Sequence, residues 1–143
     1  MQFKPITTQD EWDWVWSRAY PLQCADSQGI VAYDDKGIQA VCVADSFTID
    51  SCQVHVAIDN PLVIKYGFLH EVFTHLFHVC GRKRVFGLVP ANNEKAIKFD
   101  THIGFEEVSR IPHAYAEGVD YIVFSLAKDQ CRWIHKERQE EAA

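Results

Sequence analysis

The order of strand-like and helix-like segments is the feature that most constrains how this chain folds. In residues 53–59, Val54, Val56 and Ile58 alternate with His55 and Ala57, which is the period of two that a strand has. From Val63 to Cys80 apolar residues recur at helical spacing, and Gly81 follows, where helix C-termini favour glycine. The whole chain reads β, α, β, β, β, α, β, α, β, β, which predicts α/β layers around one mixed sheet with helices on both faces.

The remaining segments carry local signals of their own. The capping-box pattern T-x-x-E that begins at Thr8 predicts a helix near 8–19. Residues 29–33 and 38–44 are β-rich runs separated by a turn containing Asp and Gly, so we predict a hairpin. The other predicted elements are strands at 83–89, 105–111 and 119–126, a helix at 93–103, and a last helix from Asp129 to about Arg138.

Size and charge limit the chain to one acidic domain. With 143 residues and 48% apolar residues, it has room for a single hydrophobic core. We expect residues 1–127 to form this domain and residues 128–143 to form a C-terminal helix with a polar tail. The net charge of −6 argues against nucleic acid or an anionic membrane as a partner, because both favour clustered lysine and arginine.

The cysteines and the first residues indicate the compartment. Five cysteines are scattered without a C-x-x-C pair, and an odd number cannot all pair within the chain, so we expect reduced thiols. The opening MQFKPITT lacks the charged and apolar regions of a secretory signal. No apolar run approaches the roughly 20 residues of a membrane-spanning helix. We therefore expect a cytoplasmic protein.

One aspartate stands at an apolar position of the helix predicted at 93–103. On a helical wheel, Asp100 falls in the middle of an arc of four apolar residues. These residues are Ala96, Ile97, Phe99 and Ile103. An ionised carboxylate costs several kcal/mol to bury without a partner. We therefore expect that Asp100 either has a polar partner or faces a wet cleft.

The two ends of this helix have clear signals. Asn92 or Asn93 can cap its start by accepting a hydrogen bond from an otherwise unpaired N–H. Gly104 permits the positive φ that ends the helix and turns the chain into the next strand. Phe105 then places an aromatic ring in the core.

These residues form a motif, N-x-x-A-I-x-F-D-x-x-x-G-F from Asn93 to Phe105, preceded by the strand V-F-G-L-V at 85–89. The motif resembles the second half of the GNAT superfamily of N-acetyltransferases, and the upstream elements follow the family's order too. The resemblance covers most of residues 1–127. It implies a GNAT-like fold with a central, mostly antiparallel mixed sheet that is splayed in the middle.

The resemblance implies that acetyl-CoA binds where the sheet splays, between the strand ending near Ile58 and the strand at 83–89. In the family, the pyrophosphate rests on backbone N–H groups at the start of the long helix. Backbone N–H groups around Val56 would hold the thioester carbonyl, and Asn93 and Asp100 would flank the pantetheine arm. The other cofactor contacts implied by the resemblance are Lys65, Tyr66, Gly67, Phe68, Leu69 and Ala96.

Two positions depart from the family's pattern. Leu69 stands where the pyrophosphate loop usually has a small residue, and only Gly67 keeps the pattern. Many members have a tyrosine at the place of Asp100, where it protonates the departing thiolate, so the resemblance makes Asp100 the candidate catalytic residue. A carboxylate needs a large upward pKa shift, which desolvation can supply, to act as an acid at neutral pH.

The function implied by the resemblance is transfer of an acetyl group from acetyl-CoA to an amine of a small molecule or a protein. The acidic composition favours a cationic acceptor. An alternative is a catalytically silent GNAT-like binding or assembly module, similar to short virion-associated proteins of tailed bacteriophages. The sequence does not indicate an oligomeric state.

Other residues are candidates for parts of such a site. Four could take a proton from the attacking amine, and their spacing selects none: His55, Glu107, His113 and Asp120. Trp14, Tyr20 and Trp133 are candidates for acceptor or partner contact, while Trp12 and Trp16 are predicted to face inward. Glu71, His75 and His78 form a helical stripe that a metal could use, but it faces solvent without a fourth ligand. We therefore expect no metal site.

Overall fold

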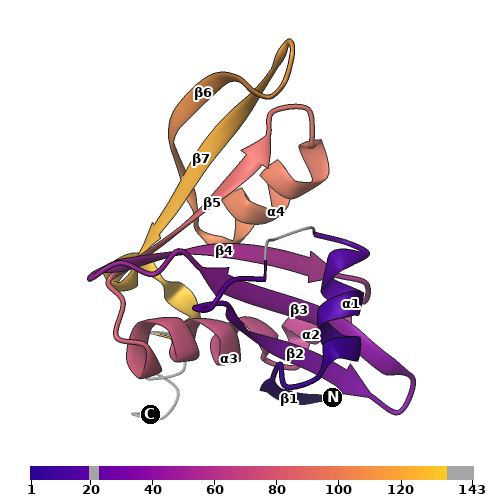
Figure 1. The fold of residues 1–143 in the computed structure, drawn as a ribbon. Helices are drawn as coiled ribbons and strands as arrows, with labels where there is room; N and C mark the ends of the chain where they lie inside the picture. Colours follow the sequence, from indigo (N-terminus) through magenta and orange to yellow (C-terminus); the bar gives the residue numbers. More distant parts are fainter. Residues whose placement is uncertain (20–22, 135–143) are drawn as a thin grey trace.

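A computed structural model describes residues 1–19 and 23–134 of the chain (Figure 1). The strands are β1 (Gln2–Pro5), β2 (Gln28–Asp34), β3 (Gly37–Asp45), β4 (Ser51–Ile58), β5 (Arg84–Pro90), β6 (Glu106–Ala116) and β7 (Val119–Ala127). The helices are α1 (Gln9–Trp16), α2 (Leu62–Lys65), α3 (Phe68–Thr74) and α4 (Glu94–Ile103). A π-helical turn (His75–Val79) extends α3, and a 3-10 turn (Lys128–Gln130) follows β7.

The seven strands form one sheet in the order β1-β2-β3-β4-β5-β7-β6. The pair β4–β5 is parallel, and all other neighbouring pairs are antiparallel. The predicted α/β class with a mixed, mostly antiparallel sheet is confirmed. The predicted hairpin corresponds to β2 and β3, and the predicted strands at 53–59, 83–89, 105–111 and 119–126 correspond to β4, β5, β6 and β7.

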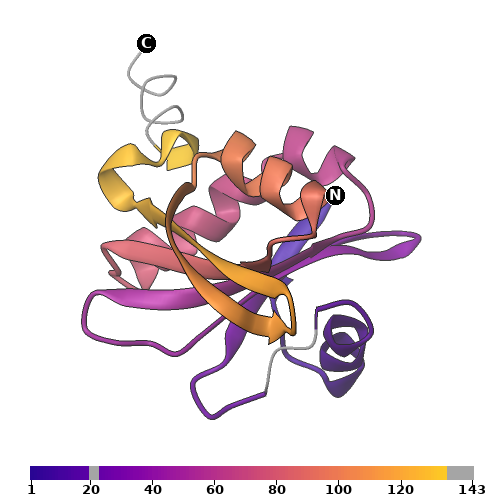
Figure 2. The same ribbon diagram turned by 90° about the horizontal axis from the view of Figure 1, so that it is seen from above.

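Helices cover both faces of the sheet, as the element order predicted (Figure 2). On one face, Trp12 and Val15 of α1 pack against apolar side chains of β2 and β3. The opposite face carries the larger core, into which α3 and α4 bury their apolar side chains. Its helical members include Phe68, Leu69, Val72, Phe73, Leu76, Phe77 and Ile103.

The start of α1 has the predicted capping box. The Thr8 hydroxyl accepts a hydrogen bond from the Glu11 N–H at 3.2 Å, and the Glu11 carboxylate accepts one from the Thr8 N–H at 3.0 Å. The prediction that Trp16 faces inward was wrong, because Trp16 is 38% exposed whereas Trp12 is 9% exposed. Val15 and Trp12 occupy the centre of the buried arc, and Trp16, about 100° beyond Val15, lies at its edge.

The helix predicted as one piece over 63–80 is interrupted. The chain leaves α2 at Lys65 and passes through Gly67, whose φ of 96° is left-handed, before α3 begins. An L-residue rarely adopts this conformation, so a glycine marks the break. The prediction of an uninterrupted helix was therefore wrong. Gly81 follows the last helical turn with φ 70°, as predicted.

Both ends of α4 follow the predictions. The Asn93 side chain caps the helix by accepting a hydrogen bond from the Ala96 N–H at 3.1 Å. Gly104 ends it with φ 114°, and Phe105 is buried in the core. Ile103 is buried, the other apolar-arc residues and Asp100 are half-buried, and the polar side of the helix is exposed.

Beyond β7 the described chain continues to Ile134. Cys131 and Ile134 are buried in the larger core, so this segment packs on the same body as the sheet. The rest of the predicted C-terminal helix and polar tail, residues 135–143, and the candidate Tyr20 lie outside the described residues. Within residues 1–19 and 23–134, no helix combines the length and apolar character needed to cross a membrane.

Candidate functional site

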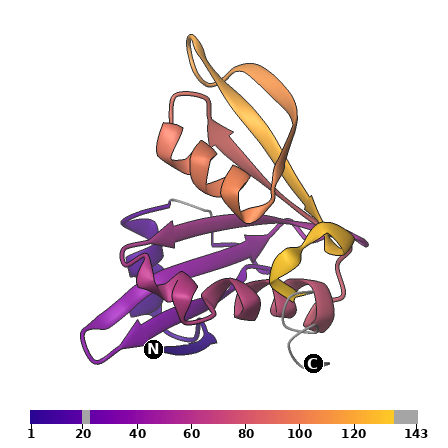
Figure 3. The same cartoon turned by 180° about the vertical axis from the view of Figure 1, so that it is seen from behind.

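The strands β4 and β5 separate soon after they begin. Three residue pairs join them, Ser51–Arg84, Cys52–Val85 and Gln53–Phe86, and no further pair follows in the described chain. From there β4 remains paired with β3, while β5 remains paired with β7, so the two halves of the sheet diverge (Figure 3). The predicted splay in the middle of the sheet is confirmed.

The strand register shows which backbone groups of β4 line the gap. The N–H of Asp59 donates to the carbonyl of Gln39 at 2.9 Å, so alternate residues of β4 bond to β3 and those between them face β5. Val54, Val56 and Ile58 are the residues whose backbone N–H and carbonyl groups point towards β5. Accordingly, a Cβ placed on Gly87 of β5 would lie 3.5 Å from the Val54 carbonyl oxygen. The backbone N–H of Val56 therefore points into the gap.

The facing edge of β5 follows the same rule. Arg84 donates its N–H to the carbonyl of Asp50 at 3.1 Å on the β4 side, whereas Ala91 donates to Asp120 on the β7 side at 2.8 Å. Leu88 has the same parity as Arg84, so its backbone N–H and carbonyl face the gap. The gap thus has a free polar backbone edge on each side.

The start of α3 offers further unpaired donors. No backbone carbonyl in the described chain accepts from the N–H groups of Phe68, Leu69 or His70, as is usual in a first helical turn. Phe68 and Leu69 bury their side chains, at 0% and 2% exposure, in the core cluster that also contacts Val54 and Ile58. The bulk of Leu69 therefore points away from these donors. Lys65 and Tyr66 are exposed on the preceding turn.

Asp100 is half-buried on α4 without a polar partner. Within the described chain its carboxylate forms no hydrogen bond or ion pair, and burial raises its pKa from 3.8 to about 6. Its charge also adds to the effects of burial and of Cys52 in raising the pKa of the buried Cys42 thiol. Cys42 lies opposite Val56 in the β3–β4 ladder. Asp100 is therefore close to the face of β4 that carries the Val56 side chain.

The other two predicted cofactor contacts on α4, Asn93 and Ala96, differ in the groups that they can offer a ligand. The Asn93 side chain is exposed, but its oxygen is used to cap the helix, which leaves only the amide NH₂ group for a ligand. Ala96 is half-buried and packs against the larger core.

Of the four predicted base candidates, only His55 lies on a strand that borders the gap. Its Nε2 is 2.9 Å from Oδ2 of Asp45, which is 6% exposed. The other three are engaged in the β6–β7 hairpin: Glu107 pairs with Arg110 at 2.8 Å, and Asp120 accepts from the His113 N–H at 3.0 Å. Asp45 was missed from the sequence, because only the pairing of β3 with β4 places it beside His55.

The remaining predicted candidates make contacts within the chain. Trp14 is half-buried with the guanidinium carbon of Arg18 3.7 Å from its ring centroid, and Arg18 forms an ion pair with Asp59 at 2.8 Å. Trp133 donates its indole N–H to the Ile103 carbonyl at 2.9 Å, at the end of α4. No group of three potential metal ligands gathers anywhere in residues 1–19 and 23–134.

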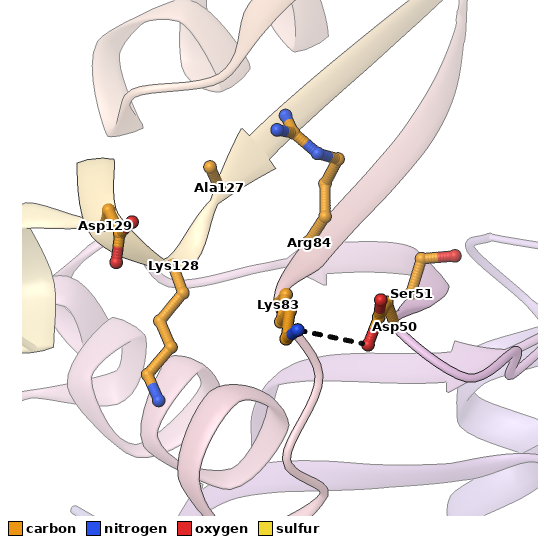
Figure 4. A pocket seen from close by; sticks show the side chains of 7 residues that line it. All are labelled: Asp50, Ser51, Lys83, Arg84, Ala127, Lys128 and Asp129. Atoms are coloured by element: carbon orange, nitrogen blue, oxygen red, sulfur yellow. Dashed lines mark ion pairs between the residues drawn. The ribbon is translucent and has the colours of Figure 1, made fainter.

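A surface pocket of about 520 Å³ lies at the joined end of β4 and β5, away from the gap (Figure 4). Lys83, Arg84 and Lys128 line it together with Asp50 and Asp129. Its ion pair between Lys83 and Asp50 is long, at 3.9 Å, and both side chains are largely exposed. This pocket offers solvated charges without a buried polar group, whereas the gap has unpaired backbone donors and a half-buried carboxylate.

Comparison with solved structures identifies the fold. Spermidine/spermine N-acetyltransferase SpeG from Vibrio cholerae, in mutant form, matches with TM-score 0.72 at 10% identity, over 94% of this chain and 99% of that one. Ribosomal-protein-S18-alanine N-acetyltransferase from Escherichia coli matches with TM-score 0.62 at 18% identity, over 88% and 92%. N-acetyltransferase PseH from Campylobacter jejuni, solved with acetyl coenzyme A, matches with TM-score 0.58 at 16% identity, over 74% and 71%.

No protein-family model and no curated protein sequence matches the chain. At 10–18% identity the likeness to the solved structures concerns the fold. That fold is the GNAT fold, as the resemblance of residues 93–105 implied.

Proposed function

We propose that this chain, which has the fold of the GNAT N-acetyltransferases, transfers an acetyl group from acetyl-CoA to an amine by direct attack on the thioester. The observation that carries the proposal is the separation of β4 and β5 after three residue pairs, which leaves a polar backbone edge open on both sides. A linear thioester-bearing arm can pair with such edges as a strand would. The PseH structure, solved with acetyl coenzyme A, provides a neighbour of this fold that binds the same ligand.

The start of α3 fits the pyrophosphate of this substrate. The unpaired N–H groups of Phe68 and Leu69 and the positive end of the helix dipole favour a bound anion. A Cβ added at Gly67 would meet no atom within 4 Å, so the backbone there is open to a ligand. Lys65 and Tyr66, exposed on the turn before it, supply a cation and a hydroxyl at the rim.

Val56 and Asp100 take the proposed chemical roles. The Val56 N–H faces the gap and can donate to the thioester oxygen as negative charge develops on it. Asp100, with a pKa raised to about 6 by burial, is partly protonated near neutral pH and can give a proton to the departing thiolate. Asn93 and Ala96 lie on the same helix and would line the pantetheine arm.

The acceptor is proposed to be a cationic amine, of either a small molecule or a protein. The net charge of −6 favours cations, and the similar solved structures include enzymes named for spermidine and for a ribosomal-protein alanine. Acetyl-CoA and five free cysteines fit a cytoplasmic protein, and we propose that location.

Acetyl-CoA binding is the first test. We expect acetyl-CoA to raise the melting temperature of the wild-type protein, since a ligand at 100 times its Kd adds about 2.7 kcal/mol to stability. Gly67→Ala should abolish this increase. Gly118→Ala is the matched control, because Gly118 also has a positive φ, 77°, and an open Cβ position, but lies in the β6–β7 turn.

Transfer is the second test. It is measured by release of the CoA thiol, with spermidine, an alanine-initiated peptide and a lysine peptide as acceptors. No stabilisation of the wild type at millimolar acetyl-CoA would refute the proposal. Stabilisation without transfer to any amine would instead support the silent binding module.

A further inference from the structure

His55 and Asp45 form a partly buried pair that acetyl-CoA binding does not explain. They are diagonal neighbours across the β3–β4 ladder, with Nε2 of His55 2.9 Å from Oδ2 of Asp45. The Ser46 hydroxyl donates to the other oxygen, Oδ1, at 3.1 Å. Both carboxylate oxygens are therefore engaged, and the carboxylate holds the imidazole ring in one orientation.

The pair and Asp100 lie on opposite faces of the same strand. His55 and Asp45 share strand parity with Ala57 and Val43, which belong to the α1-side cluster. Val56 has the opposite parity, on the face near Asp100. Because side chains alternate along a strand, His55 places its imidazole on the α1 side of the sheet, whereas the Val56 side chain lies on the opposite side, near Asp100.

We propose that His55, positioned by Asp45, is the general base that takes a proton from the acceptor amine. This inference rests on the proposed function. Since a carboxylate only accepts hydrogen bonds, Nε2 carries the ring proton and Nδ1 keeps its lone pair. In the described chain nothing bonds to Nδ1, and the His55 side chain is 21% exposed, which leaves the Nδ1 lone pair without a partner in the protein.

The proton steps balance as follows. An ammonium acceptor, R–NH₃⁺, gives one proton to Nδ1 of His55, and its nitrogen attacks the thioester carbonyl carbon. The new C–N bond forms and the C–S bond breaks, with the second amine proton passing to the thiolate directly or through Asp100. The products are the amide and the CoA thiol, and His55 returns its proton to water.

Among the residues that the structure describes, no other charged group forms a hydrogen bond with the imidazole. On the same face, Arg84 of β5 lies at the joined end of the strands and donates to the Ser125 hydroxyl at 3.2 Å. At the other end of β4, Asp59 is engaged by Arg18, which follows α1. Among described residues, Asp45 is the acidic group that bonds the ring.

The experiment compares His55→Ala, Asp45→Asn and a control, His102→Gln, which changes an exposed histidine of α4. Acetyl-CoA binding is measured by thermal shift, and transfer by CoA thiol release with the three amines named above. His55→Ala should lower kcat/KM by about 10²-fold or more, the usual contribution of a general base, and leave acetyl-CoA affinity unchanged. Added imidazole should restore part of its rate.

Asp45→Asn should also lower the rate, without rescue by imidazole, because an amide NH₂ can donate to Nε2 and leave the proton on Nδ1. The pH dependence of the rate should change in His55→Ala. A structural role alone would give neither the rescue nor this change.

The outcomes separate the two proposals. An unchanged rate in His55→Ala, or a lowered rate that imidazole does not restore, overturns the base assignment and leaves the proposed function standing. A wild-type protein that acetylates none of the three amines overturns both.

Discussion

Asp100→Asn should stabilise the protein at neutral pH, because burial without a partner makes the ionised carboxylate unfavourable in the folded state. A pKa raised from 3.8 to about 6 corresponds to about 3 kcal/mol, at about 1.4 kcal/mol per pKa unit. Asp100 is half-buried and keeps some water, so we expect a gain of about 1–3 kcal/mol.

The sign follows from proton binding. Between pH 3.8 and about 6 the folded state holds the Asp100 proton more tightly than the unfolded state, so this group's contribution to stability falls as pH rises through that range. Asp100→Asn removes the titration, and its advantage over the wild type should therefore be small at pH 4 and full at pH 7.5.

Urea unfolding at both pH values measures the difference. Asp35→Asn is the control, since Asp35 is exposed in the β2–β3 turn. Two results would refute the claim that Asp100 lacks a partner. One is a variant less stable than the wild type at pH 7.5, and the other is a difference in the free energy of unfolding that is the same at both pH values.

Three further substitutions test other parts of the fold. Glu11→Gln should lower the free energy of unfolding at pH 7 by about 2 kcal/mol. Burial would raise the pKa of Glu11, but Lys4 and the Thr7 and Thr8 N–H groups outweigh it and lower the pKa to about 2. Urea unfolding should show this loss vanish as pH falls from 4.5 towards 2. Gly104→Ala should cost about 1–2 kcal/mol in the same assay, since φ is 114° there, and no cost would contradict a left-handed helix end. Phe77→Ala should cost about 3–5 kcal/mol, because Phe77 is 1% exposed, whereas Ile49→Ala, at 91% exposed, should cost nothing measurable.

The signals that were local in sequence predicted the structure well. The hairpin and the caps of α4 depend on residues within about one or two turns of each other, where propensity and periodicity act directly. The splay of the sheet came from the resemblance instead, since no single strand records whether its neighbour stays paired.

The features that were missed depend on contacts between distant residues. Asp45 looks like any residue at the end of a strand until β3 pairs with β4 and brings His55 beside it. The break before α3 was missed because the apolar spacing continues across Gly67, although its backbone does not. Trp16 was placed inward because the wheel gives direction but not the width of the sheet beneath α1.

The seam between β4 and β5 has a mechanical consequence. Its middle pair, Cys52 and Val85, is fully buried, at 0% exposure each, and lies one residue before the last pair, Gln53 and Phe86, after which the two strands diverge. With only three pairs joining the strands there, we expect the side-chain volume at these two positions to influence the separation of the two sheet halves. Exchanging one of these buried side chains for a larger or smaller one would then change the width of the gap without altering the backbone groups of Val56 and Leu88 that line it.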